Sequence, residues 1–101
     1  MKFISLKPST RPDKRFMITF SEPKKTIHFG AKDGSTYLDH KDKTKRENYL
    51  ARHKVREDWT KVNAGSLSAL LLWGDSSNIS SNLDAYLRKF NISRYLFIFI
   101  K

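Results

Sequence analysis

Apolar and polar side chains alternate along the first thirty residues, which is the spacing of β-strands that bury one face. Three short runs have this strand-like character, residues 3–6, 16–20 and 25–29, and Ser-Glu-Pro-Lys separates the last two. A short polar segment between two such runs is typical of a hairpin. We therefore predict a strand over 3–6, a proline-containing loop over 7–14 and a hairpin over 16–29.

Helical spacing follows, and residues 43–54 are predicted to form the first helix. Asp39 or Asp42 can cap its first turn, because a carboxylate accepts the free N–H groups there. At 100° per residue, one stripe of this helix is cationic and another side can pack inward. The stripe holds Lys41, Lys45, Asn48 and Arg52. The packing side holds Tyr49, Leu50 and His53.

Two further helices are predicted in the second half of the chain. The first has Asn63 as its candidate cap and Gly74 just beyond its end, where glycine is common. Its apolar stripe consists of Leu67, Leu70 and Leu71. In the second, Ser81 and Asp84 have the spacing of a capping box. Its apolar stripe consists of Ile79, Leu83, Tyr86, Leu87 and Phe90.

Two segments are less regular. Gly30 and Gly34 bracket a tight connection in which we expect positive φ angles, and residues 35–38 form either a third short strand or an extended lead into the first helix. Residues 95–100 are apolar on both alternating faces. Such a strand has to be covered on both sides, so we expect it to be central in the sheet or buried by another protein.

These elements predict an α+β fold in one domain over residues 1–101. The N-terminal hairpin and the C-terminal strand would form a small antiparallel sheet, with three helices packed on one face. No segment approaches the roughly 20 apolar residues that a membrane-spanning helix needs. We therefore expect no transmembrane segment, although attachment to an anionic membrane surface stays open.

The chain is strongly basic. It has 20 Lys and Arg against 10 Asp and Glu, a formal net charge of +10, and no cysteine. Residues 1–61 contain 16 of the basic and 8 of the acidic side chains. This excess favours a polyanionic partner, namely nucleic acid, an anionic membrane face or an acidic protein surface. The absence of cysteine excludes disulfides and thiolate metal sites.

Candidate chemistry is sparse. His40 and Asp42 have a spacing that could hold a metal, but a cap at the start of the helix explains the same residues. Residues 29–35 resemble a phosphate loop but lack its Gly-Lys-Ser/Thr ending. Glu57 and Asp58 are adjacent and therefore point apart. We predict no enzyme activity, no catalytic residue, no metal and no cofactor.

The basic helix is the most informative candidate site. We predict polyanion contacts from five side chains, Lys41, Lys45, Arg46, Arg52 and Arg56. No base-reading module is recognisable, so contacts to nucleic acid would be made to phosphates and would be largely independent of sequence. The alternative is a solvated helix face that only keeps a small protein soluble.

An ordered set of residues between 29 and 74 carries a resemblance. It consists of Phe29-Gly30, Tyr37, His40-Lys41-Asp42, Lys45-Arg46, Tyr49, Arg52-His53, Trp59, Ala64-Gly65, Ser68 and Leu72-Trp73. This set resembles an uncharacterised family of small basic proteins encoded by nucleocytoplasmic large DNA viruses. Members often carry Asp/Asn-Pro after the tryptophan, where this chain has Thr60-Lys61-Val62. The resemblance implies a viral setting but no activity and no catalytic residue.

Two functions are expected from these observations. The first is a minor capsid protein, a structural virion protein that cements capsid units from the capsid interior face and is located in the host cytoplasm during assembly. Its partners would be capsid proteins, with the basic helix facing acidic loops, lipid headgroups or genome. The second is a DNA-binding protein without sequence specificity, acting through phosphate contacts from the basic helix.

Overall fold

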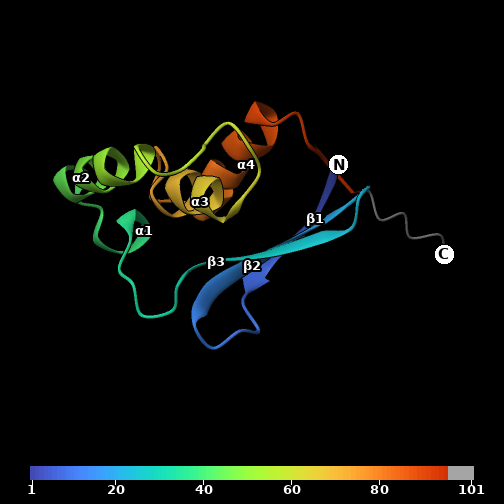
Figure 1. Ribbon diagram of the computed structural model, residues 1–101, viewed down its shortest axis with the longest axis horizontal. Coiled ribbons are helices and arrows are strands. Elements are labelled where there is room, and N and C mark those ends of the chain that lie inside the picture. The colour runs from blue at the N-terminus through green and yellow to red at the C-terminus, as the bar shows by residue number, and fades with distance from the viewer. Residues whose placement is uncertain (96–101) are drawn as a thin grey trace.

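The computed structural model describes residues 1–95 and has an α+β fold, as predicted (Figure 1). In chain order its elements are β1 (Lys2–Pro8), β2 (Lys14–Ser21), β3 (Lys25–Ala31), α1 (Tyr37–His40), α2 (Lys43–Lys54), α3 (Ala64–Leu67), the π-helix η1 (Ser68–Leu72), α4 (Ile79–Lys89) and β4 (Ser93–Arg94). The strand predicted over 95–100 lies outside the described residues, except for Tyr95. Within residues 1–95, no helix is long and apolar enough to cross a membrane.

The sheet has the strand order β3-β2-β1-β4. The predicted hairpin is confirmed: β2 and β3 are antiparallel, with Phe16 opposite Phe29 and Ile18 opposite Ile27. β1 adds to β2 in the antiparallel sense, with an irregularity in register between Phe3 and Ser5. The sheet is mixed and not wholly antiparallel, because the chain returns beside β1 after α4 and β4 runs parallel to β1.

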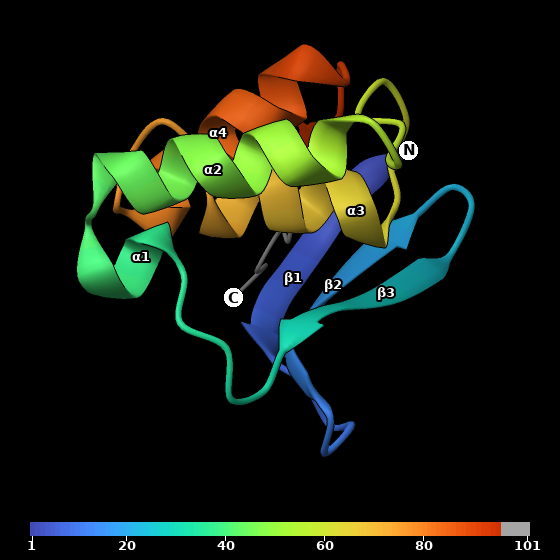
Figure 2. The same ribbon diagram turned by 60° about the vertical axis from the view of Figure 1, so that its left-hand side comes forward.

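The core lies between one face of this sheet and the helices α3, η1 and α4 (Figure 2). The sheet contributes Phe3, Ile18, Phe20 and Phe29. The helices contribute Leu67, Leu71, Leu72, Leu83, Tyr86 and Leu87. The hydroxyl groups of Tyr86 and Ser66 are hydrogen-bonded at 2.8 Å inside this core, and burial raises the pKa of Tyr86 to about 12. Both predicted apolar stripes therefore supply the core, as expected.

The connection from β3 to the helices agrees with its prediction at Gly30 but differs at Gly34 and over residues 35–38. Gly30 has a φ of +78°, and a Cβ there would lie 2.7 Å from Leu72 Cδ1. Positive φ at Gly34 is wrong: the N–H of Gly34 donates to the Ala31 carbonyl at 3.1 Å in a turn that does not require it. The alternative of a strand over 35–38 is also wrong, because α1 begins at Tyr37.

A capping box fixes that short helix. Thr36 is its N-cap, and the Asp39 carboxylate accepts the backbone N–H of Thr36 at 2.8 Å. Arg15 of β2 donates to both carboxylate oxygens of Asp39, at 2.7 and 2.8 Å. The hydrogen bond from Arg15 is the largest cause that holds the pKa of Asp39 well below its usual range. Arg15 thus ties α1, the first helix, to strand β2 of the sheet.

The other helix starts follow capping rules, with one correction. Asp42 caps α2 by accepting the N–H groups of Thr44 and Lys45, and Asn63 caps α3, as predicted. The capping box predicted from Ser81 and Asp84 is wrong. Asn78 caps α4 one turn earlier and accepts the N–H of Ser81. Asp84 pairs instead with Arg94 beyond the helix.

Candidate polyanion-binding face

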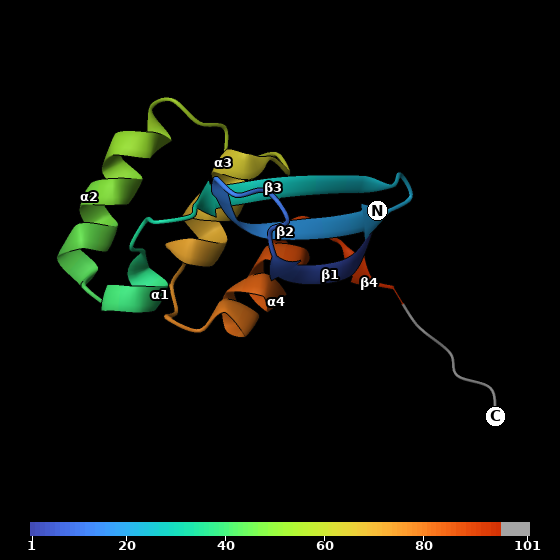
Figure 3. The same cartoon turned by 90° about the horizontal axis from the view of Figure 1, so that it is seen from below.

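α2 lies on the outside of the helical layer, at the opposite end of the structure from the turn between β2 and β3 (Figures 1 and 3). It spans Lys43–Lys54 as predicted, but none of its residues is buried. Most helices owe their stability to a packed apolar face. α2 must therefore be held by a few specific contacts at its surface.

Aromatic stacking makes the first of these contacts. The ring of Tyr49 lies on the indole of Trp73, with centroids 4.2 Å apart and planes 5° apart. His53 stacks on Tyr49 at 4.0 Å, and His40 lies 5.2 Å from Trp73. Burial raises the pKa of Tyr49 to about 12. The packing side predicted for this helix is thus a stack of rings, and it rests on Trp73.

Glu57 secures the end of α2. Its carboxylate accepts from the indole N–H of Trp59 at 2.9 Å and is hydrogen-bonded to His53 Nδ1 at 2.8 Å. A Cβ on Gly65 would lie 3.1 Å from the Glu57 side chain, so the chain approaches closely there. Asp58 turns away and accepts from Thr60. The two adjacent carboxylates point apart, as predicted.

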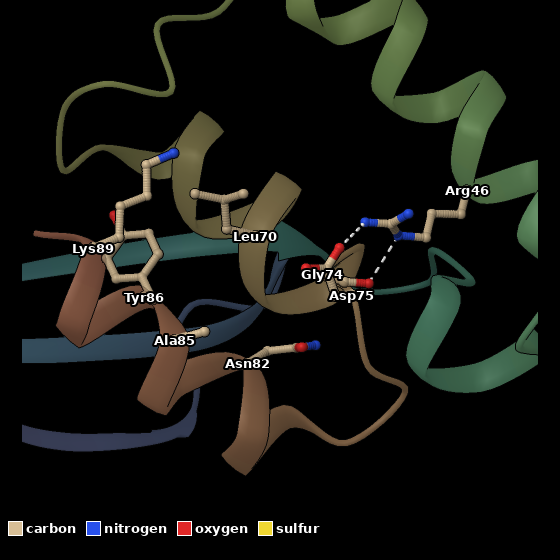
Figure 4. Close-up of a pocket in the computed structure, with 8 residues that line it drawn as sticks. All are labelled: Arg46, Leu70, Gly74, Asp75, Asn82, Ala85, Tyr86 and Lys89. Carbon is tan, nitrogen blue, oxygen red and sulfur yellow. Dashed lines mark hydrogen bonds and ion pairs between the residues drawn. The ribbon is translucent and has the colours of Figure 1, made fainter.

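Arg46 makes the second attachment of α2 (Figure 4). Its Nε donates to the carbonyls of Trp73 and Gly74 at 3.0 and 2.8 Å, and its Nη2 pairs with Asp75 at 2.7 Å. The guanidinium also lies over the ring of Tyr37, 5.7 Å from its centroid. Of the five side chains predicted to bind a polyanion, Arg46 is therefore occupied within the protein.

The other four predicted cations are exposed and have no ion pair or side-chain hydrogen bond among residues 1–95. They are Lys41, Lys45, Arg52 and Arg56. Lys43 and Lys54 are exposed and unpaired in the same way, and the prediction missed them. On a helical wheel, both lysines lie away from the cationic stripe, on a side of α2 that would pack inward if the helix were buried. Because α2 buries no residue, every lysine on it reaches solvent.

The predicted stripe is shorter than expected, because the helix does not extend back to Lys41. That residue ends α1 in the left-handed conformation, with a φ of 56°, and α2 starts after Asp42. The remaining members, Lys45, Asn48 and Arg52, line one wall of a hollow of about 230 Å³. The structure therefore brings three of the stripe's residues together and separates Lys41 from them.

Three residues outside α2 also line this hollow, namely Ser35, His40 and Trp73. His40 Nδ1 accepts the backbone N–H of Asp42 at 2.9 Å, while its buried Nε2 has no partner. No group of three or more His, Asp or Glu side chains in residues 1–95 is placed to hold a metal ion. The arrangement offers cations and hydrogen-bond donors, which is the chemistry of anion binding.

A family of unknown function, DUF5754, matches residues 4–53 of the chain. This match spans β1 to the last turn of α2 and covers just under half of the 101 residues. It includes the cation pair Lys45 and Arg52 but not Arg56. No curated protein and no solved structure matches the chain.

Proposed function

We propose that this protein binds nucleic acid through its phosphates, using the exposed cations of α2 and of the residues that flank it. Residues 41–56 contain seven Lys and Arg side chains. Of these seven, only Arg46 has an ion-pair partner among the described residues. The observation that carries the proposal is this concentration of six unpaired cations, four on a helix that buries none of its residues and two, Lys41 and Arg56, beside it.

A helix that serves only as a soluble surface would mix both signs of charge. Two of the three acidic side chains in residues 41–57 are engaged, since Asp42 caps α2 and Glu57 bonds to His53 and Trp59. Glu47 is the one exposed carboxylate of α2, so the cations still outnumber it. Lys41 and Lys45 are four residues apart, as are Arg52 and Arg56, and these neighbouring like charges repel one another. A polyanion removes that repulsion and gains from counterion release.

Base recognition is not part of the proposal. Single-stranded nucleic acids are often held by aromatic rings on which bases stack. Here Tyr49 and Trp73 stack on each other, and His53 covers Tyr49 from the other side. Binding is therefore expected to depend on phosphates and salt, with little dependence on sequence.

The experiment is a titration of duplex DNA by fluorescence anisotropy at 50 and 200 mM NaCl. The affinity of the wild-type protein should fall steeply as the salt concentration rises. In the double variant Lys45→Glu/Arg52→Glu, the slope of log K against log salt should be smaller by about 1.8, because each of the two lost phosphate contacts contributes about 0.9. Lys24→Glu/Lys25→Glu is the matched control, because it changes the charge equally at the far end of the molecule. DNA binding that is undetectable or independent of salt contradicts the proposal. If the protein binds anionic vesicles but not DNA, its partner is an anionic membrane surface.

A second candidate is the minor capsid protein expected from the resemblance, with capsid proteins as partners and the virion as location. The observation in its favour is the separation of two contact surfaces, the cationic α2 and the edge strand β3. An open strand edge can pair with a strand of another protein. In a virus that encodes this chain, mass spectrometry of purified virions should detect it, and its absence would rule this function out.

A further inference from the structure

Three hollows border α2, and two of them, which contain its cations, differ in charge. The one shown in Figure 4 is lined by Arg46 and Lys89 but also by Asp75, which pairs with Arg46. The other contains Lys45 and Arg52 and has no carboxylate among its lining residues. A solvent-exposed pocket with cations of one sign and no internal counterion is suited to hold an anion.

The donors that line this second hollow come from two segments of the chain. Lys45, Asn48 and Arg52 are spaced three and four residues apart, so their side chains share one side of α2. Ser35, from the segment that precedes α1, lines the same hollow. Among residues 1–95, none of these four side chains makes a hydrogen bond or an ion pair. Two cations, an amide and a hydroxyl are thus available to a single oxyanion.

The remaining lining residues limit what else can enter. Trp73 is only 9% exposed, and one face of its indole is covered by Tyr49. His40 lies against Trp73, at 5.2 Å between ring centroids. Because Trp73 is so little exposed, its indole offers little surface for a base to stack on. With a volume of about 230 Å³, the hollow has room for an oxyanion and a few water molecules.

We infer that this hollow is a subsite for one phosphate group, in which Lys45 and Arg52 pair with the charge while Asn48 and Ser35 donate hydrogen bonds. The inference rests on the proposed function and deepens it, because it gives one phosphate of the nucleic acid a defined place. The other exposed cations of α2 then contact neighbouring phosphates without fixed geometry.

The test is an NMR titration of the 15N-labelled protein with inorganic phosphate, with NaCl adjusted to hold the ionic strength constant. Saturable shifts are expected at the side-chain amide of Asn48, the backbone N–H of Ser35 and the indole N–H of Trp73. Arg52→Gln should weaken the phosphate affinity about tenfold, because a hydrogen bond between charged groups is lost. Lys54→Gln is the matched control, since it removes an equal charge from the same helix outside the hollow.

The inference is overturned if Arg52→Gln and Lys54→Gln weaken phosphate binding equally, or if shifts spread along α2 without saturating. Thermal unfolding of both variants shows that each is folded. Single-stranded DNA with and without a 5′-phosphate then distinguishes the source of the group: tighter binding of the phosphorylated strand indicates a terminal phosphate, and equal binding indicates an internal diester.

The same DNA titrations separate this inference from the proposed function. Saturable binding of inorganic phosphate in the hollow, together with no DNA binding, supports the phosphate site and rejects nucleic acid as the partner. DNA binding that leaves Asn48 and Ser35 unperturbed supports the function and rejects the subsite.

Discussion

Tyr49 and Trp73 lie 24 positions apart in the chain and stack with their ring planes 5° apart. Tyr49 belongs to the cationic helix, whereas Trp73 closes the buried helix η1 and packs with the core. The pair joins a helix without buried residues to the rest of the protein. Four predictions follow from this contact and from others around it.

Tyr49→Ala should lower the free energy of unfolding by about 2 kcal/mol, from lost apolar area and lost ring stacking. Urea denaturation followed by circular dichroism measures this change. Tyr49→Phe, which keeps the ring, is the control and should remain within about 0.5 kcal/mol of wild type. An equally small effect of Tyr49→Ala would mean that the stack does not hold α2.

Arg46→Gln should destabilise the protein by about 1–3 kcal/mol, because the Trp73 and Gly74 carbonyls lose their donor and Asp75 loses its partner. Arg52→Gln is matched in charge and breaks no contact within the described residues, so its unfolding temperature should equal that of wild type. Differential scanning calorimetry compares the two variants. Equal unfolding temperatures for both would contradict a structural role for Arg46.

The pair Arg15 and Asp39 predicts a specific dependence on pH. The pKa of Asp39 is lower in the folded protein than in the unfolded chain, chiefly through the hydrogen bond from Arg15. Its stabilising contribution is therefore complete above the ordinary carboxyl pKa of about 3.9 and is lost as the pH falls further. Asp39→Asn should be less stable than wild type at pH 7, and the difference should shrink below about pH 4. Urea titrations at pH 7 and pH 3 measure this, and a difference that is constant across pH would contradict it.

Gly30→Ala should cost about 1–3 kcal/mol, because φ is +78° and the new Cβ would lie 2.7 Å from Leu72 Cδ1. Gly34→Ala is the control: its backbone does not require glycine, and the nearest atom would be 3.3 Å away. Chemical denaturation of the two variants should therefore show a clearly larger loss for Gly30. Similar losses would mean that the strain is not located at Gly30.

Local patterns predicted the parts of the fold that depend on neighbouring residues. The hairpin of β2 and β3, the bounds of α2 and the apolar stripe of α4 all follow from periodicity and capping. The start of α4 was misplaced because the Ser81 and Asp84 spacing is a common pattern, whereas the amide of Asn78 takes the capping position first.

Contacts between distant residues account for what the pattern did not predict. α1 is fixed by Arg15, which reaches Asp39 from 24 positions away. Arg46 was assigned to the binding surface because nothing near it in the sequence indicates the carbonyls at Trp73 and Gly74. Likewise, the hollow beside Lys45 and Arg52 exists only because Trp73 and the segment around Ser35 meet α2 in space.

The absence of buried residues in α2 has a consequence for how this protein can change over generations. Substitutions at four exposed positions of α2 alter no packed side chain, so they need no compensating change in the interior. These positions are Lys43, Lys45, Arg52 and Lys54. Under the proposed function, the residues that contact the polyanion are therefore separate from those that hold the fold. Single substitutions on α2 would then alter the affinity for that partner while the fold is inherited intact.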